Sequence, residues 1–362
     1  MMAFMAMQKA LLDWFDKNAR PLPWRKKYLP YEVWVSEIML QQTQVNTALP
    51  YFERWMKELP TLEHLAKSDE KKVLKLWQGL GYYSRARNLH ASAKFIMEKY
   101  NGVFPSNHQI ILSLKGIGRY SAGAISSIAF NQETPIVDGN VLRVLSRVYA
   151  IDKPIDVEKN KAIFWELEEK LIPKGKARFF NQALMELGAL VCSTRNPACA
   201  VCPIKNFCLA YIKDTAENYP VRQKKKKTVK IAASALILKK DGKYLIWKRP
   251  LGQIMGGLWE FPEWKLAQNK IMAPEESRKK TIPLVEKEFS IKPKYMEYLG
   301  SIKRNYTYFN EKLDTFLIEL RNGSKNWEPK TDWSAAWVTE KEFEKYPFSS
   351  AHSKITKLLS GR

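Results

Sequence analysis

Residues 107–130 read NHQIILSLKGIGRYSAGAISSIAF, and this stretch decides the fold of the first half of the chain. Two segments with apolar residues at helical spacing flank residues 114–119, where Gly116 and Gly118 stand two residues apart. Glycines allow a sharp turn and a close backbone approach to a ligand. The stretch predicts a helical hairpin whose turn amides, with the helix beginning near Tyr120, bind a DNA phosphate. An ordinary helix-helix turn is the alternative, and the motif alone does not exclude it.

The periodicity of the sequence changes once along the chain. Helical spacing of apolar residues extends from residue 1 to about residue 218, and the lysine-rich stretch VRQKKKKTVK follows at 221–230. Short β-like segments, IAASALIL, KYLIWKR and DTFLIEL, then alternate with turn signals. Because one core rarely exceeds roughly 250–300 residues, two modules are expected. We predict an α domain at 1–218 with a metal loop at 192–208, a basic linker at 219–230 and an α+β domain at 231–362.

The composition favours a polyanionic partner. The chain has 60 basic and 37 acidic residues, a net charge of +23, and 45% hydrophobic residues, so it is neither disordered nor collagen-like. Such a charge favours binding to nucleic acid, although general basicity or a membrane surface would also account for it. No apolar run approaches the ~20 residues of a membrane span. The opening MMAFMAMQKALL reads as a helix rather than a signal peptide, so we expect a cytoplasmic protein.

All four cysteines lie within 17 residues, in the spacing C-x6-C-x2-C-x5-C. Four thiolates on short loops can bind one tetrahedral zinc ion or one iron-sulfur cluster. Two disulfides are the alternative, which a cytosolic protein disfavours. The spacing alone does not choose between the two metals, although its unequal gaps depart from the paired CxxC of most zinc ribbons. The predicted ligands are Cys192, Cys199, Cys202 and Cys208.

Two carboxylates suggest glycosidic chemistry. Asp138, in IVDGNV, stands at an expected helix start, where capping would keep it ionised beside a positive, oxocarbenium-like transition state. Glu37, in YEVWVSEIMLQQTQV, falls on the apolar stripe of a helix. Burial there would raise its pKa and keep a proton available for general acid catalysis. We therefore expect two environments that push the two pKa values apart. A solvated glutamate and a simple capping aspartate are the alternatives.

The order of hairpin, aspartate loop and cysteine loop resembles the endonuclease III superfamily of DNA repair enzymes, whose loop binds a [4Fe-4S] cluster. Within it, SEIMLQQTQV, WQGLGYYSRARNL, VDGNVLRVLSR and FNQALMELGALVC resemble the MutY family of adenine DNA glycosylases, over about residues 14–208. The resemblance implies a [4Fe-4S] cluster on the four cysteines. It also implies base-excision repair that removes adenine opposite 8-oxoguanine or guanine in double-stranded DNA. We expect a monomer that does not bind membranes and that associates with the nucleoid if it is bacterial.

The resemblance also implies residue roles. Glu37 would protonate the adenine, Asp138 would stabilise the sugar cation, and Tyr120 and Asn140 would support them. The residues implied to line the adenine pocket are Arg20, Trp24, Arg25, Leu40 and Gln182. The residues implied to contact DNA are Gln41, Gln42, Thr43, Tyr82, Lys115, Gly116 and Gly118.

The residue after the hairpin decides the type of reaction. Relatives that also cut the strand have a lysine there, whose amine attacks the sugar. This chain has Tyr120, and a phenol cannot form an imine, so the resemblance implies a glycosylase that leaves an abasic site. Lys115 departs from the proline usual in this hairpin, which leaves a weak lyase activity open.

The second domain resembles a Nudix-like domain through MGGLWEFP at 255–262. The helix candidate ESRKKTIPLVEKEFS lacks the glutamate pattern that binds magnesium in Nudix hydrolases, and we expect Pro283 to interrupt it. The family reads 8-oxoguanine with a loop of Phe-Ser-His type, which corresponds here to Tyr306-Thr307-Tyr308. Tyrosine in place of the histidine leaves the discrimination against guanine open, and the two tyrosines could instead pack on a strand.

Three other functions compete with this hypothesis. An endonuclease III-like lyase would share the fold, but Tyr120 and the second domain argue against it. A damage-binding protein without catalysis would not need both Glu37 and Asp138. A nucleotide-pool hydrolase would need the missing Nudix glutamates.

Overall fold

The computed structural model describes residues 2–223, 228–250, 252–253, 255–306, 308–320 and 334–360. The chain forms two compact units. The first comprises residues 1–68 and 84–224, and the second comprises residues 69–83 and 225–362. The second unit thus includes a segment from the first half of the sequence, residues 69–83, which contains α5 (Glu70–Leu76). Each unit is described below by itself.

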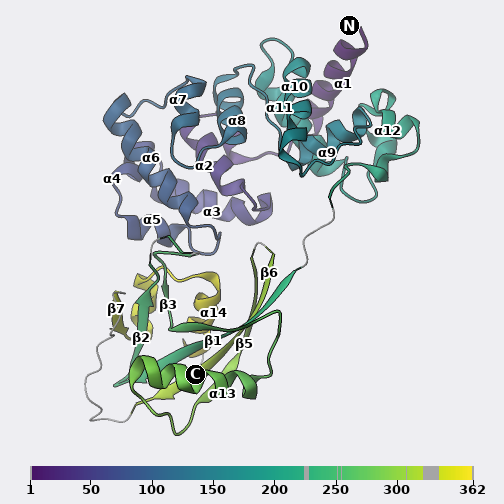
Figure 1. Cartoon of the computed structure of the whole chain (residues 1–362). Coiled ribbons are helices and arrows are strands. Elements are labelled where there is room, and N and C mark those ends of the chain that lie inside the picture. The colour runs from purple at the N-terminus through teal and green to yellow at the C-terminus, as the bar shows by residue number, and fades with distance from the viewer. Residues whose placement is uncertain are drawn as a thin grey trace. The chain divides into compact units, whose positions relative to one another are not determined.

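The first unit is built from helices (Figure 1). They are α1 (Met2–Asn18), α2 (Pro30–Leu40), α3 (Val45–Glu58), α4 (Leu62–Lys67), α6 (Ser84–Tyr100), α7 (His108–Ser113), α8 (Arg119–Phe130), α9 (Gly139–Val148), α10 (Lys161–Leu171), α11 (Ala177–Leu190) and α12 (Leu209–Ile212). Short 3-10 turns at Pro23–Arg25, Glu158–Asn160, Cys199–Val201, Lys205–Phe207 and Ala216–Asn218 join some of them. None of the helices described in either unit is long and apolar enough to span a bilayer.

The predicted helical hairpin is confirmed. Asn107 caps α7 by accepting the backbone N–H groups of Gln109 and Ile110, and α8 begins directly after Gly118. Gly116 has a φ of +79°, and a Cβ there would lie 2.5 Å from the Asn88 side chain. Both the left-handed backbone and the close contact therefore require glycine at this turn.

The core of the first unit lies where α9, α11 and α1 meet. Leu145 of α9, Phe180 of α11 and Leu11 of α1 are buried in one cluster. The two helices α9 and α11 approach so closely that a Cβ on Gly188 would lie 2.6 Å from the Cβ of Asn140. This close approach places the start of α9 against the C-terminal half of α11.

The second unit contains a mixed sheet of seven strands among the described residues. The strands are β1 (Val229–Lys240), β2 (Lys243–Lys248), β3 (Trp259–Glu260), β4 (Glu263–Gln268), β5 (Glu297–Tyr306), β6 (Phe309–Glu319) and β7 (Ala335–Val338). Their order is β3-β2-β1-β6-β5, β4 also pairs with β1, and β7 pairs with β2. The β1 and β6 strands run parallel, whereas β5 and β6 form an antiparallel hairpin. The α+β fold expected for this part of the chain is confirmed.

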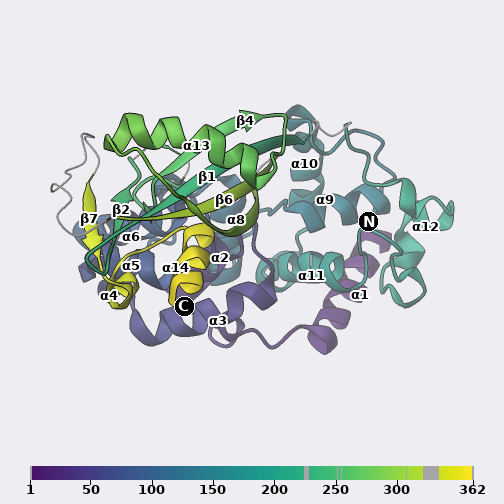
Figure 2. The ribbon, with the colours of Figure 1, turned by 90° about the horizontal axis from the view of Figure 1, so that it is seen from below.

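Two helices cover opposite faces of this sheet, as Figure 2 shows. Alternate residues of β1 point to opposite faces. Ala233, Ala235 and Ile237 therefore pack in one cluster with α14 (Ser350–Ser360), and Leu236 and Leu238 pack in another with α13 (Pro274–Phe289). A further 3-10 turn, Glu340–Lys345, precedes α14.

Two details of the predicted second domain differ from the structure. Pro283 does not interrupt a helix, because α13 continues through it from Pro274 to Phe289. A proline removes one backbone hydrogen bond, and the burial of Val285 and Phe289 against the sheet keeps the last turns helical. The first strand begins at Val229, inside the stretch predicted as linker. Residues 224–227 of that stretch lie outside the described part.

We predict that Gly123→Ala destabilises the first unit although Gly123 lies inside α8. Alanine normally stabilises a helix interior relative to glycine, but a Cβ here would overlap the carbonyl oxygen of Pro135. We expect a loss of about 1–3 kcal/mol in urea unfolding. Gly139→Ala, at the first position of α9 with open space around it, is the matched control and should lose nothing.

Candidate active site

One cavity of the first unit, about 480 Å³ in volume, brings together most of the predicted catalytic and adenine-pocket residues. The predicted residues that line it are Arg20, Trp24, Arg25, Glu37, Leu40, Thr43, Tyr120, Asp138, Asn140 and Gln182. They come from α2, α8, α9 and α11, from the segment between α1 and α2 that contains the 3-10 turn Pro23–Arg25, and from the residues just after α2 and just before α9. The cavity is thus assembled from segments that are more than one hundred residues apart in the sequence.

Glu37 is buried on α2, with 3% of its surface exposed. Almost the whole helix from Tyr31 to Met39 is buried, so the helix is surrounded by protein rather than amphipathic. Burial raises the pKa of Glu37 to about 7, although the Tyr120 hydroxyl, which donates to Glu37 Oε2 at 3.0 Å, opposes the shift. A carboxyl with this pKa holds a proton near neutral pH and can release it.

Asp138 is the N-cap of α9, as predicted. Its Oδ1 accepts the backbone N–H of Val141 at 2.7 Å, and its Oδ2 accepts the Asn140 amide at 3.0 Å. A fixed carboxylate at a helix N-terminus also faces the positive end of the helix dipole. Both oxygens are therefore held in place from the side of the helix.

The expectation that the two environments shift the pKa values in opposite directions is wrong. Burial raises the pKa of Asp138 as well, and it outweighs the lowering by the Val141 N–H and the Asn140 amide. The sequence revealed the cap but not the depth of burial, which comes from the packing of α9 against α11. Burial thus shifts the pKa of both carboxyls upward, and it raises that of Glu37 to about 7.

A residue that sequence reasoning missed organises one part of the cavity lining. Glu186 accepts Arg20 Nε at 2.6 Å and Arg25 Nη2 at 2.9 Å, and 1% of its side chain is exposed. Burial alone would raise its pKa, but these two guanidinium groups lower the pKa to about 2. Arg25 Nε also donates to Gln182 Oε1 at 2.9 Å. The signal in the sequence was a carboxylate four residues after Gln182 on the same apolar helix.

The loop that leads into Asp138 has a buried support, which sequence reasoning also missed. Glu168 of α10 is fully buried and accepts the backbone N–H of Ile136 at 3.0 Å. Burial raises the pKa of Glu168 to about 9, so this carboxyl is protonated at neutral pH. Asn181 of α11 donates to the carbonyl of Thr134 in the same loop. The loop is therefore fixed from two helices.

All four cysteines line one small cavity, and none forms a disulfide. The buried Arg147 lies beside them and donates from Nη1 to Cys192 Sγ at 3.2 Å. Burial raises the pKa of Cys202 to about 11. A soft metal centre would displace such thiol protons, and a neighbouring guanidinium suits an anionic group, so the donor set fits an iron-sulfur cluster.

A single arginine joins the cysteine loop to the cavity. Arg143 Nε donates to the carbonyl of Cys192 at 2.7 Å. Its Nη2 donates to Asn140 Oδ1 at 2.8 Å and to the carbonyl of Gly188 at 2.6 Å. Since Asn140 in turn donates to Asp138, a continuous chain of hydrogen bonds leads from the loop to that carboxylate.

The predicted DNA-contacting residues lie outside the cavity, apart from Thr43. Gln41 donates to Ser121 Oγ at 3.0 Å, and Gln42 has a φ of +56°. Lys115 is exposed in the hairpin turn, as are Gly116 and Gly118. Tyr82 belongs to the second unit and is 51% exposed.

The predicted lesion loop is only partly described. Tyr306 is the last residue of β5, and Tyr308 is 48% exposed with its ring 4.3 Å from that of Phe309. Thr307 and the side chain of Tyr306 lie outside the described residues.

Comparisons with known proteins agree with this arrangement. Residues 35–170 match the HhH-GPD superfamily of base excision DNA repair proteins, and residues 233–358 match the NUDIX domain. A structure of a thermostable thymine-DNA glycosylase is 28% identical and covers 59% of this chain and 98% of its own, with a TM-score of 0.53. That similarity concerns the helical part of the fold.

Three relatives carry the same name, adenine DNA glycosylase. The protein of Buchnera aphidicola subsp. Acyrthosiphon pisum is 37% identical over 86% of this chain and 85% of its own length. The human protein is 31% identical over 99% of this chain and 74% of its own. The protein of Arabidopsis thaliana is 34% identical over 88% of this chain, which spans 58% of that longer relative. The chain therefore belongs to the adenine DNA glycosylase family of base-excision repair enzymes.

Proposed function

We propose that this protein hydrolyses the N-glycosidic bond of adenine paired with 8-oxoguanine or guanine in double-stranded DNA, and leaves an abasic site. The observation that carries the proposal is the pairing of two different carboxyls in one cavity. Glu37 is deeply buried and hydrogen-bonded to a phenol, whereas Asp138 caps a helix. The protein would act on DNA as a monomer, and its cytoplasmic location stays a prediction.

Glu37 is the general acid of the proposed reaction. It donates its proton to adenine N7, so that the base leaves as a neutral purine when the bond between C1′ and N9 breaks. The bonding electrons go to the base, and the sugar becomes an oxocarbenium ion. The Asp138 carboxylate stabilises this cation, and a water molecule then adds to C1′ and loses a proton. Tyr120 and Asn140 position the two carboxyls through the hydrogen bonds described above.

A polar group in the cavity lining supports recognition of a flipped adenine. Arg25, Gln182 and Glu186 form one hydrogen-bonded group there, with Arg20 completing the ion pairs. Such a group can face the polar edge of a base once the base has left the helical stack. Trp24, which is buried beside Phe52, and Leu40 add apolar surface.

The proposed absence of strand cleavage rests on the lack of a suitable amine nucleophile among the described residues of the cavity. In the described part of the chain, no lysine lines the cavity. Tyr120, which by resemblance stands in place of the lysine of strand-cutting relatives, lines the cavity with a phenol instead. Lys115 stands in the exposed hairpin turn, so any lyase activity through it would be weak.

The cysteine loop would hold a [4Fe-4S] cluster through Cys192, Cys199, Cys202 and Cys208. The fit rests on the convergence of four free thiols on one cavity and on the Arg147 guanidinium beside them. The cluster would fix the loop from which the carbonyl of Cys192 accepts Arg143. The second unit would recognise the 8-oxoguanine through Tyr306-Thr307-Tyr308.

The proposal predicts that Asp138→Asn abolishes adenine release. Asparagine also caps helices well, so the substitution removes the charge and keeps the helix start. We expect a loss of about 10²-fold or more in single-turnover release from duplexes with adenine opposite 8-oxoguanine. Asp69→Asn is the matched control, because Asp69 caps α5 in the same way outside the cavity, and it should keep the wild-type rate.

Strand analysis in the same experiment tests the reaction type. Wild-type product should break only after alkali, and borohydride should trap little protein on the DNA. Efficient trapping without alkali would instead identify a lyase. Release of no adenine from any duplex, by protein that retains its metal centre, would contradict the enzyme assignment.

We predict that the release rate falls as pH rises through about 7, because Glu37 then loses the proton that it must donate. Tyr120→Phe removes the hydrogen bond that favours ionised Glu37. In this variant, the fall of the release rate with rising pH should therefore occur at a higher pH than in the wild type. The measurement is the single-turnover rate at saturating enzyme between pH 5 and 9. An unchanged profile in Tyr120→Phe would mean that Glu37 is not the titrating acid.

Cys202→Ser should lose iron and sulfide together. Iron, sulfide and zinc analysis of the purified protein measures this, with Ser193→Ala as the control within the same loop. We also expect slower adenine release, because the Arg143 anchor at Cys192 loosens. Stoichiometric zinc without sulfide in the wild type would favour a structural zinc site instead.

A further inference from the structure

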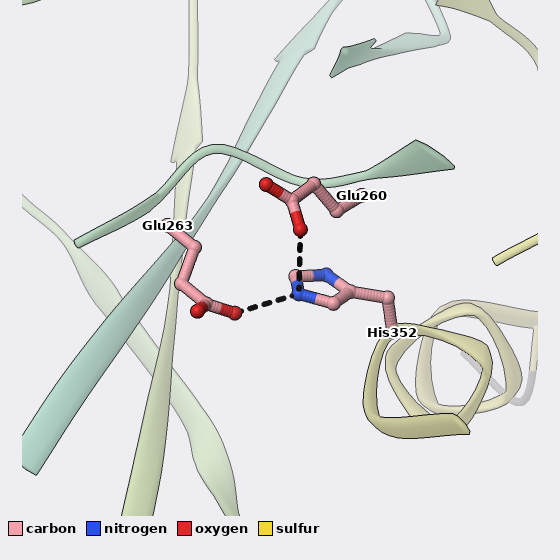
Figure 3. Close-up of side chains that lie close together, drawn as sticks. All are labelled: Glu260, Glu263 and His352. Carbon is pink, nitrogen blue, oxygen red and sulfur yellow. Dashed lines mark hydrogen bonds and ion pairs between the residues drawn. The ribbon is translucent and has the colours of Figure 1, made fainter. Parts of the chain in front are cut away.

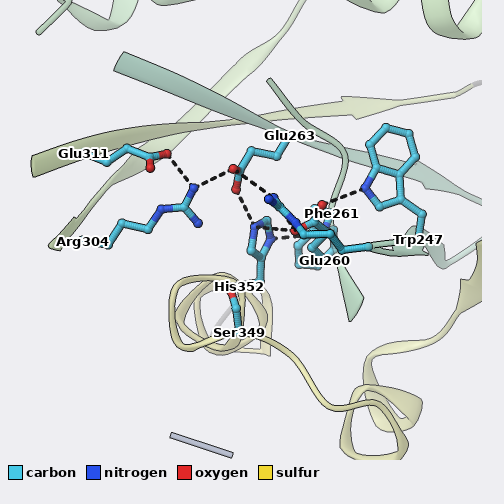
Figure 4. Close-up of polar contacts among 9 residues, drawn as sticks. Trp247, Glu260, Phe261, Glu263, Arg304, Glu311, Ser349 and His352 are labelled. Carbon is cyan, nitrogen blue, oxygen red and sulfur yellow. Dashed lines mark hydrogen bonds and ion pairs between the residues drawn. The ribbon is translucent and has the colours of Figure 1, made fainter. Parts of the chain in front are cut away.

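A cluster of six ionisable side chains lies inside the second unit. Glu260, Glu263 and His352 lie together at its centre, as Figure 3 shows. One carboxylate oxygen of each glutamate and one imidazole nitrogen, the atoms that could bind a metal ion, lie within 4.8 Å of one another. Arg304 and Glu311 extend it, as Figure 4 shows. Arg249 also joins it through ion pairs with Glu260 and Glu263. His352 is fully buried, and Glu260 and Glu311 are 3% and 2% exposed. A cluster of this kind requires either a bound cation or complete internal pairing.

The hydrogen bonds favour internal pairing over a cation. The backbone N–H of Phe261 donates to His352 Nδ1 at 3.1 Å, so the imidazole proton is on Nε2. Nε2 therefore donates to Glu263 Oε2 at 2.8 Å and offers no lone pair to a metal. Arg249 donates to Glu260 Oε2 at 2.8 Å. The guanidinium groups thus supply the positive charge that a metal ion would bring.

Arg304 connects this cluster to the β5–β6 hairpin. It stands directly opposite Glu311 in the ladder. Its Nη2 lies 2.6 Å from Glu311 Oε1 within the hairpin and 2.6 Å from Glu263 Oε1 at the start of β4. Two residues beyond Arg304, β5 ends at Tyr306. Arg304 therefore links the end of the hairpin to a strand that the hairpin itself does not contain.

Arg249 provides the contrast within the same cluster. It follows β2 directly and pairs with Glu260 and Glu263, at 2.8 and 3.3 Å. Both of these partners lie in or next to β3 and β4. Both guanidinium groups therefore neutralise Glu263, and of these two only Arg304 belongs to the β5–β6 hairpin.

We propose that Arg304 is a positioning residue for recognition of the base opposite adenine: its buried ion pairs with Glu263 and Glu311 fix the end of β5 against β4 and β6. This inference rests on the proposed function, because that function assigns lesion recognition to Tyr306-Thr307-Tyr308.

Two physical effects make Arg304 suited to the role. At the hairpin end β6 also pairs with β1 up to Phe309, whereas β5 is the edge strand of the sheet, and the end of an edge strand frays more easily. A guanidinium buried between two carboxylates resists such opening, because separating them leaves charges unpaired at low exposure. His352 and both arginines hold the pKa of Glu263 well below its usual range despite its burial, so the anchor stays ionised at neutral pH.

The test compares Arg304→Gln with Arg249→Gln. Each removes one guanidinium from the same cluster, so both should lower the thermal unfolding temperature of the protein. Adenine release is measured at limiting enzyme on duplexes with 8-oxoguanine or guanine opposite adenine. We expect the ratio of the two rates to fall roughly tenfold in Arg304→Gln only, since small misplacements of binding groups cost rate. The maximal rate on the guanine duplex should stay at the wild-type value.

Hydrogen exchange of peptides that cover residues 305–312 gives a second readout. The exchange should be faster in Arg304→Gln than in Arg249→Gln. Glu311→Gln keeps an acceptor for Arg304, so it should lower the ratio of the release rates and speed the hydrogen exchange by smaller amounts. It replaces Arg304→Gln in the test if that variant does not fold.

The outcomes separate the two hypotheses. The role of Arg304 would be overturned if the ratio of the two release rates fell equally in both arginine variants, or if the hairpin peptides exchanged equally fast in both. The cluster would then contribute only to the stability of the second unit. A wild-type ratio near one would instead overturn the proposed recognition of the lesion, and the exchange data would still decide whether Arg304 anchors the hairpin.

Discussion

The Arg143 guanidinium is the group on which the geometry of the candidate active site depends. It is 8% exposed, and burial lowers its pKa, yet an arginine remains charged at any physiological pH. Its hydrogen bonds to the carbonyls of Cys192 and Gly188 and to Asn140 join the cysteine loop, α11 and α9. Asp138 is held through Asn140, so the position of that carboxylate depends on the cysteine loop, whose described residues do not line the cavity.

The cavity itself shows how one protein holds three carboxyls in different states. Burial raises the pKa of Glu37 to about 7, because only the Tyr120 hydroxyl donates to it. Burial is opposed in Glu186 by two arginines, which lower its pKa to about 2. Asp138 is stabilised by the N–H and amide groups of a helix start, without a direct ion pair. Burial outweighs the neutral hydrogen-bond donors of Glu37 and Asp138, and only the two guanidinium groups beside Glu186 outweigh burial.

The second unit uses the same physical chemistry for a different purpose. Its buried carboxylates are neutralised by Arg249 and Arg304, and a backbone N–H fixes the tautomer of His352. Buried ion pairs of this kind add little to stability on balance, but separating the partners leaves an uncompensated buried charge, so they discriminate against arrangements of the strands that separate them. Such discrimination suits a hairpin whose end must stand in one place.

The sequence by itself determined the hairpin at Gly116 and Gly118, the capping role of Asp138, the change from helices to strands near residue 230, and the convergence of four cysteines. Each of these depends on local backbone preferences or short spacing, which neighbouring residues settle. It did not determine the upward shift of the Asp138 pKa, the wall built by Glu186, or the continuation of α13 through Pro283. Those depend on burial and on partners more than one hundred residues away or on another layer of the fold, and only the tertiary structure brings them together.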